Sequence, residues 1–162
     1  MLRNDIIKLL RKQKVAFDLD GTLLYTRRAL THAYLQAGAR WVPNTPWTEF
    51  ATPRQHAIKN NCYEEAVKNY AYRMPCFAWA TRYSAPIITS ASLDATMAIN
   101  RVYPELEVTQ SGCSIVEKIQ ALEYMNVCWY VDDDHEARGE IQEHTSVHVA
   151  SPEVFIEIMG EL

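Results

Sequence analysis

The stretch Asp18 to Thr22, with the sequence Asp-Leu-Asp-Gly-Thr, places two carboxyl groups one residue apart. Carboxylates this close repel each other, and a bound cation or a shared proton relieves the repulsion. Gly21 allows a sharp turn directly after the pair, and the Thr22 hydroxyl adds a hydrogen-bond donor. The spacing therefore predicts a site that holds a cation or moves a proton, although Asp and Gly are also ordinary turn residues.

The acidic pair follows three apolar residues, Val15-Ala16-Phe17, which predict a buried strand. Its carboxyl groups should then lie at a strand end, the edge at which open α/β sheets bind ligands. Further residues able to do chemistry stand near other predicted elements: Thr89 and Ser90 after an Ile-Ile run, Lys118 on a helix, and Asp132, Asp133 and Asp134 after a strand. Each alone is explained as a cap or a solvated charge, so the prediction rests on their combination.

Five short runs predict strands, at residues 15–17, 86–89, 106–109, 127–131 and 147–150. Cap residues and apolar spacing predict helices between them, at residues 92–102, 114–125 and 151–158. Strands that alternate with helices are typical of a parallel sheet with helices on both faces. We therefore predict an α/β fold built on a doubly wound parallel sheet.

The segment from residue 25 to residue 85 breaks this alternation and shows only helical patterns. One helix is predicted over residues 27–37, ending at Gly38, and another begins at Thr52-Pro53. Asn61 with Glu64 resembles a capping box that starts a further helix. We therefore predict an all-helical insert after the first strand.

The chain is accordingly divided into a body, residues 1–24 and 86–162, and the insert, residues 25–85. The insert contains eight Lys or Arg against three Asp or Glu, while the rest contains eight against seventeen. It also holds eleven of the seventeen aromatic residues. A basic, aromatic segment above an acidic body suits an anionic substrate, one with a base to stack. Alternatively, the aromatic residues form the core of a small bundle and the charges a solvated face.

The composition is that of an ordinary globular protein: 162 residues, 48% hydrophobic and 22% charged. No apolar run is long enough to span a membrane, and residues 1–14 predict an amphipathic helix rather than a signal peptide. The cysteines at positions 62, 76, 113 and 128 lack zinc-site spacing and predict reduced thiols, with Cys128 in the core. These features favour a cytoplasmic protein.

The residues singled out above, taken in chain order, resemble the four motifs of the haloacid dehalogenase superfamily, whose members are mostly phosphatases. The first motif is a strand followed by Asp18 to Thr22, and the second is a strand that ends in Thr89. Lys118 matches the third motif, and Asp132-Asp133 matches the Asp-Asp form of the fourth. The resemblance covers the body and hardly reaches the insert, which lies where the family places one class of small cap domain.

The resemblance implies an Mg²⁺-dependent phosphatase that forms an aspartyl-phosphate. Asp18 would attack phosphorus, and Asp20 would protonate the leaving group and then activate water. Phosphate oxygens would be bound by Thr22, Thr89, Ser90 and Lys118. Mg²⁺ would be held by oxygens of Asp18, Asp20 (through its backbone carbonyl), Asp132 and Asp133, with either of the last two as the direct ligand.

The substrate stays open at this stage: a small phosphorylated metabolite, a nucleotide or a nucleic-acid 3′-phosphate. Arg54, His56 and Lys59 of the insert could face the site, and His135 invites a proton-relay role or is a bystander. Receiver domains use similar residues in a different order, and a mutase would be expected to carry a larger insert. The remaining alternative is a catalytically silent binding protein on the same fold.

Overall fold

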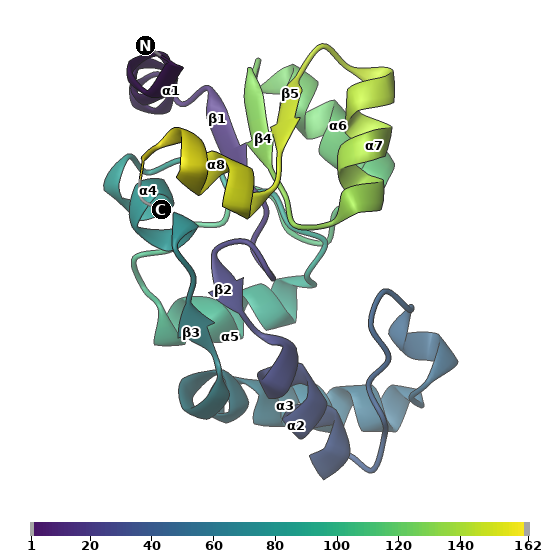
Figure 1. Cartoon of the computed structure of the whole chain (residues 1–162). Helices are drawn as coiled ribbons and strands as arrows, with labels where there is room; N and C mark the ends of the chain where they lie inside the picture. Colours follow the sequence, from purple (N-terminus) through teal and green to yellow (C-terminus); the bar gives the residue numbers. More distant parts are fainter. Residues whose placement is uncertain (1, 161–162) are drawn as a thin grey trace.

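A parallel sheet with helices on both faces forms the centre of the computed structural model, which describes residues 2–160 (Figure 1). Strand β1 (Val15–Phe17) pairs with β4 (Trp129–Val131), and β4 pairs with β5 (His148–Ala150). Phe17, Val131 and Ala150 are partners in register across the three strands. The sheet therefore brings the residues after β1 and after β4 to one edge, as the sequence predicts.

Two further segments extend the sheet beyond β1 through isolated parallel bridges. Ile87 pairs with Phe17, and Ile88 pairs with Gln110. The strand predicted at 106–109 is wrong, because the parallel bridge forms one residue later, at Gln110, although the Thr109 amide also donates to the Ile87 carbonyl at 2.9 Å. Side chains take the place of some backbone pairing there. The Ile87 backbone amide donates to the Thr109 hydroxyl at 3.2 Å, and the Asn100 side-chain amide donates to the Leu106 carbonyl.

Side chains of alternate residues face the two sides of the sheet, as the pleat requires. Val15, Phe17 and Val131 belong to one apolar cluster, which also contains residues of α1 (Leu2–Arg11) and α8 (Pro152–Ile158). Ala16 and Tyr130 belong to a second cluster, with residues of α6 (Ile115–Tyr124) and α7 (His135–His144). Helices therefore cover both faces, which confirms the doubly wound arrangement.

Helix starts in the body lie where the cap residues predict them. The Ser92 hydroxyl accepts from the Ala95 amide at the start of α5 (Leu93–Val102). Ser114 and Glu117 form a reciprocal capping box at the start of α6. Each cap satisfies amide groups that the first helical turn leaves without partners.

The insert contains a short strand pair as well as helices. Its helical elements are α2 (Arg27–Gln36), the 3₁₀ turn Trp47–Glu49, α3 (Pro53–Tyr70) and α4 (Cys76–Arg82). Strand β2 (Leu24–Tyr25) pairs antiparallel with β3 (Tyr72–Arg73), so the expectation of an all-helical insert is wrong at Tyr25 and at β3, which precedes α4. The pair brings the start of the insert beside the segment between α3 and α4, and the Tyr25 and Tyr72 rings stack at 4.8 Å.

Helix α3 begins as predicted but does not break where predicted. Thr52 and Gln55 form a capping box ahead of Pro53. The second start predicted at Asn61 is wrong, because α3 continues through it to Tyr70. No Gly or Pro stands near Asn61 to end the helix, and Asn in a helix interior lowers helix propensity only modestly.

The division into body and insert stays a prediction, and two observations bear on where it would lie. Helix α4 is adjacent to α8 of the body, and the Cys76 thiol lies 3.8 Å from the Pro152 carbonyl (Figure 1). The larger apolar cluster is continuous from Phe155 in the body to Tyr63 and Val67 in the insert.

Cys62, Cys113 and Cys128 are free thiols, and Cys76 and Cys113 are buried. Cys128 is exposed, so its predicted core position is wrong; it precedes β4, and the buried side chains of that strand begin with Tyr130. Within residues 2–160, none of the helices combines the length and the apolar character that crossing a lipid bilayer demands.

Candidate active site

Backbone pairing between neighbouring strands brings the first and fourth motifs together. The Asp18 amide donates to the Val131 carbonyl at 2.9 Å, and the Asp132 amide donates to the Ala150 carbonyl at 3.1 Å. Asp18 and Asp132 therefore directly follow paired strands at the carboxyl edge of the sheet. This is the edge at which parallel sheets of this kind hold their ligands.

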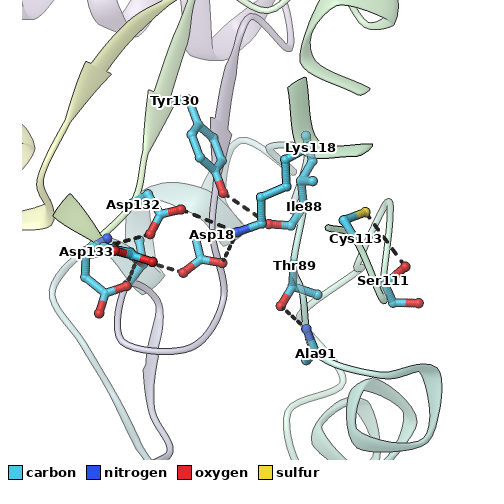
Figure 2. A network of polar contacts seen from close by, with 12 residues as sticks. Asp18, Ile88, Thr89, Ala91, Ser111, Cys113, Lys118, Tyr130, Asp132 and Asp133 are labelled. Atoms are coloured by element: carbon cyan, nitrogen blue, oxygen red, sulfur yellow. Dashed lines mark hydrogen bonds and ion pairs between the residues drawn. The ribbon is translucent and has the colours of Figure 1, made fainter. Parts of the chain in front are cut away.

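Lys118 reaches this edge from α6 and links the two acids (Figure 2). Its Nζ lies 3.2 Å from Asp18 Oδ1 and 3.4 Å from Asp132 Oδ2, and all three side chains are buried. The centre of the Tyr130 ring lies 5.7 Å from Lys118 Nζ, and the Tyr130 hydroxyl donates to the Ile88 carbonyl at 3.4 Å. Lys118 is thus fixed in place and keeps a positive charge beside Asp18.

Thr22 and Gly21 tie the first motif to Asp133. The Thr22 hydroxyl donates toward Asp18 Oδ2 at 3.5 Å and Asp133 Oδ1 at 3.3 Å, and it accepts from the Asp133 amide at 3.1 Å. Thr22 is fully buried, so this geometry favours a positioning role over the phosphate contact that the sequence suggests. Gly21 has φ +79°, and a Cβ there would lie 2.2 Å from Asp133 Oδ2.

Asp20 is held by a contact of its own, outside the group of Asp18, Asp132 and Asp133. The Thr26 hydroxyl donates to Asp20 Oδ1 at 2.6 Å, from the residue that precedes α2. The motif itself gives no signal for Thr26, because nothing in the spacing of these two residues is distinctive. Asp20 also borders a cavity of about 440 Å³, shared with Gly21 and Asp133. A group attached to a phosphate at Asp18 would find the Asp20 carboxyl at the wall of this space.

Thr89 and Ser90 follow Ile88 at the same sheet edge, next to Asp18 through the pairing of Phe17 with Ile87. Thr89 is buried, and its hydroxyl accepts from the Ala91 amide at 3.0 Å, which leaves its own proton free to be donated (Figure 2). Ser90 is exposed. Phosphate binding by these two residues stays a prediction.

The remaining acids after β4 have different surroundings. Asp132 is buried, and its Oδ1 accepts from the Asp134 amide at 2.9 Å. Asp134 caps α7 by accepting from the Glu136 amide at 3.0 Å. His135 is exposed at the start of α7, and its imidazole forms no hydrogen bond with another of the described residues. Arg138 donates to the Asp132 carbonyl at 2.7 Å and so fixes the turn.

The site carries more negative charge than its own residues neutralise. Burial raises the pKa of Asp18 well above its usual value; Asp132, Asp20 and Asp133 raise it further, and only Lys118 lowers it. Burial also raises the pKa of Asp20, and burial with Asp132 raises that of Asp133. For Lys118, burial acts to lower the pKa, but Asp18 and Asp132 raise it above its usual value. A second cation would relieve this imbalance.

The donor set fits a divalent metal ion. Asp18, Asp132 and Asp133 each offer a carboxylate oxygen, and the three atoms lie within 4.8 Å of one another. Hard oxygen donors of this kind suit Mg²⁺, which prefers one or two carboxylates with waters and a substrate phosphate. The hydrogen bonds of Thr22 with the Asp133 carboxylate and amide hold one of these carboxylates beside the first motif.

Of Arg54, His56 and Lys59, the insert residues expected to face the site, Lys59 is the one whose pKa responds to the charge of Asp20. It is 3% exposed, its Nζ lies 4.4 Å from the Tyr63 ring centre, and Asp20 and Asp94 are the acids that act on it. His56 instead stacks on Trp47 at 4.0 Å and bonds to the Tyr34 hydroxyl, and Arg54 is exposed.

No family model matches this sequence, and no curated protein resembles it closely enough in sequence to count as a relative. Solved structures do match. A protein named as a candidate phosphoglycolate phosphatase from Lactobacillus plantarum aligns with TM-score 0.62 and 18% identity, covering 90% of this chain and 98% of its own. CbbY from Rhodobacter sphaeroides, solved with phosphate, aligns with TM-score 0.56 and 17% identity, covering 85% and 84%.

A haloacid dehalogenase-like hydrolase from Streptococcus pneumoniae aligns with TM-score 0.52 and 16% identity, over 83% of this chain and 81% of its own. This chain has the haloacid dehalogenase fold. The fold predicted from the motifs is thereby confirmed. Within that fold, the first, second and fourth motif segments occupy the ends of adjacent sheet segments, and Lys118, the third motif, reaches them from a helix on one face.

Proposed function

We propose that the protein is an Mg²⁺-dependent phosphomonoester hydrolase that acts through an aspartyl-phosphate on Asp18. The observation that carries the proposal is the pairing of Asp18 with Lys118 at 3.2 Å beside two further acids able to hold a cation. A phosphoryl group needs a nucleophile, neutralisation of its charge and a proton for the leaving oxygen. The site holds a residue suited to each need.

In the first step, an Asp18 carboxylate oxygen attacks phosphorus and the bond from phosphorus to the ester oxygen breaks. The leaving oxygen takes the proton of the Asp20 carboxyl, which stands at the cavity wall. Burial raises the pKa of Asp20, which favours its protonated form, and the Thr26 hydroxyl fixes one of its oxygens. Lys118 offsets charge on the phosphoryl oxygens and on Asp18.

In the second step, Asp20, now a carboxylate, removes a proton from water. The hydroxide oxygen bonds to phosphorus, and the bond from phosphorus to Asp18 breaks, which releases phosphate and restores the carboxylate. Asp18, Asp132 and Asp133, with the Asp20 carbonyl, would hold Mg²⁺. When bound, the ion supplies further charge neutralisation for the phosphoryl group.

Asp18→Asn tests the nucleophile directly. Hydrolysis of an aryl phosphate with Mg²⁺ should fall by about 10³-fold or more, because the amide neither attacks phosphorus nor forms the intermediate. The folded structure should persist, since the change removes one charge from a cluster with excess negative charge. Borohydride reduction during wild-type turnover should convert an acyl phosphate at position 18 into homoserine, detected by mass spectrometry. Turnover of Asp18→Asn near the wild-type rate would remove Asp18 from this role.

A catalytically silent binding protein on the same fold is the second candidate, and it predicts a different outcome. Such a protein would neither hydrolyse aryl phosphates nor bind Mg²⁺. The buried Lys118 between two acids argues against it, because desolvating buried charges, even paired ones, costs free energy that apolar residues of the same volume would not cost. Phosphoglycolate, the substrate in the name of one similar structure, is one compound to include in a panel of phosphate esters.

A further inference from the structure

Two neighbouring cavities connect the site to the outer surface of the insert. The first, about 440 Å³, is bordered by Asp20 and Asp133 at one end and by Trp41, Tyr25 and Arg27 in the insert. The second, about 420 Å³, is lined by Tyr25, Arg27, Arg28, Thr31, His32, Leu35 and Tyr70. Tyr25 and Arg27 border both, so the two cavities are neighbours that share a wall, and together they are here called the insert groove. Each is within the size range of sites for small organic groups.

The cations of the insert groove have no acidic partners. Arg27 and Arg28 are exposed, and neither forms an ion pair within residues 2–160. This differs from Arg73 and Arg101, which pair with Glu105 and Glu64. The only acid that the groove adds to the site residues is Glu153, at the body end. The outer part is therefore positive and open to an anion.

Aromatic rings accompany these cations along the groove. The Arg27 guanidinium lies 5.8 Å from the Trp41 ring, and the Arg28 guanidinium lies 5.7 Å from the Tyr70 ring. His32 contacts Tyr70 at 4.6 Å between ring centres. Alternating aromatic rings and guanidinium groups are the parts from which proteins build sites for single-stranded nucleic acid, where bases stack and phosphates meet cations.

We propose that the insert groove binds a single-stranded oligonucleotide whose terminal phosphate lies at Asp18. This inference rests on the proposed function and names its substrate class. Nucleotides next to the phosphorylated end would stack beside Trp41 and Tyr25, and the following ones beside Tyr70. Arg27 and Arg28 would meet the linking phosphates. A small phosphorylated metabolite beside Asp20 would not reach Arg28 or Tyr70, because these two residues line only the second cavity and Asp20 lines only the first.

Binding is measured with Asp18→Asn protein in Mg²⁺, by fluorescence anisotropy of single strands of DNA and of RNA. Each strand is tested with a 3′-phosphate, a 5′-phosphate or no terminal phosphate. Phosphorylated ends should bind more tightly than bare ends. Arg28→Glu and Tyr70→Leu should each weaken binding by about 10-fold, as loss of one stacked base does. Arg28→Ala should reduce the slope of log affinity against log salt by about 0.7, the value for one phosphate of a single strand.

Lys68→Glu is the matched control, because Lys68 lies exposed on α3 and borders neither cavity. It should leave oligonucleotide binding within about 2-fold of the parent, because its side chain lines neither cavity and so contacts neither the bases nor the linking phosphates. Equal effects of Lys68→Glu and Arg28→Glu would overturn the groove and leave only general electrostatic attraction. In otherwise wild-type protein, Arg28→Glu should lower kcat/KM for the oligonucleotide relative to that for an aryl phosphate by about 10-fold.

The outcomes separate this inference from the proposed function. Hydrolysis of aryl phosphates without binding or hydrolysis of phosphorylated oligonucleotides would overturn the groove and keep the hydrolase. Oligonucleotide binding that depends on Arg28, in a wild-type protein that hydrolyses no phosphate ester, would keep the groove and overturn the hydrolase. An equal preference for bare and phosphorylated ends would also overturn the proposal, because the terminal phosphate would then not occupy the site.

Discussion

Lys118 and Lys59 are both buried, yet their surroundings differ in kind. Lys118 lies between two carboxylates, which raise its pKa. Lys59 is 3% exposed, forms no ion pair within residues 2–160 and has the Asn60 side chain as its hydrogen-bond acceptor at 3.3 Å. Burial lowers the pKa of Lys59 to about 8, against the opposing effect of Asp20 and Asp94. The first lysine is stabilised by its neighbours, and the second costs stability while it is charged.

The Lys59→Met variant should therefore be more stable than wild type near neutral pH. The folded-state pKa of Lys59 lies below its unfolded value of 10.5, so between about pH 8 and pH 10.5 the unfolded chain binds more protons and wild-type stability rises with pH. The advantage of Lys59→Met should shrink over that window by on the order of 3 kcal/mol. Urea unfolding of both proteins at several pH values measures it.

Lys68→Met is the control for this prediction, since Lys68 is exposed on the same helix. It should show no comparable pH-dependent difference from wild type. If Lys59→Met and Lys68→Met follow the same pH dependence, Lys59 is solvated in solution. A stabilised Lys59→Met with weaker turnover would indicate that the lysine is kept for the site and not for the fold.

The sequence predicts which acids meet at the sheet edge better than it predicts the residues that surround Asp20. Asp18 and Asp132 meet because parallel strands bring their carboxyl ends to one edge, and Lys118 follows from its place in the motif order. Thr26 gives no such signal, and Lys59 is only one of three insert residues, with Arg54 and His56, that the sequence names as able to face the site. The contacts of Thr26 and Lys59 with Asp20 and its surroundings depend on how the insert folds back over the body, which no local pattern encodes.

At the scale of elements, the turn at Gly21 determines where the Asp133 carboxylate lies. A Cβ at position 21 would lie 2.2 Å from Asp133 Oδ2, and φ there is +79°. Gly21→Ala should therefore displace Asp133 as well as strain the backbone, by about 1–2 kcal/mol for the left-handed conformation alone. Mg²⁺ affinity, measured by calorimetry, should fall by about 10-fold or more, as expected from loss of one well-placed ligand.

Gly112→Ala separates strain from displacement. Gly112 also has positive φ, +65°, but no atom lies within 4 Å of a Cβ built there. This variant should lose similar stability and keep its Mg²⁺ affinity. Similar Mg²⁺ affinities for the two variants would show that Asp133 moves aside without consequence or does not bind the ion.

Strand and helix patterns predict the body more closely than the insert, for a physical reason. Strand β1 and helices α5, α6 and α8 begin with local signals, an apolar run or a Ser cap, which act without help from distant residues. The pair β2–β3 joins residues almost fifty positions apart, and its strands are two residues long. Its stability comes from the packing around it, which short-range propensity cannot reveal.

At the scale of the molecule, metal binding should be visible as stability. Mg²⁺ at about 100 times its dissociation constant should raise the free energy of unfolding by about 2.7 kcal/mol, because the unfolded chain has no site. Asp133→Asn should lose most of this gain. Glu143→Gln should keep it, since Glu143 belongs to an exposed group with Glu140 and His144 on α7, remote from the sheet edge. Thermal unfolding with EDTA and with Mg²⁺ gives both comparisons; equal gains for the two variants would place the ion elsewhere.

The continuous apolar cluster predicts that body and insert unfold together. It includes Phe17 and Phe155 of the body and Tyr63 of the insert, so neither part can expose its core alone without exposing the other. Tryptophan fluorescence, which reports on Trp41, Trp47 and Trp79 in the insert and on Trp129 in the body, should follow the same transition as far-UV circular dichroism. Two separated transitions would show that the insert is an independent domain.

Pairing of β2 with β3 has a topological consequence. Tyr25 and Tyr72 are partners in register, so everything from residue 26 to residue 71 is, in connectivity, the loop of a single hairpin. Loop closure becomes less favourable only slowly with length. Evolution could therefore shorten, lengthen or exchange this stretch without any strand of the parallel sheet changing its neighbours, while the edge that carries Asp18 and Asp132 stayed where β1 and β4 place it.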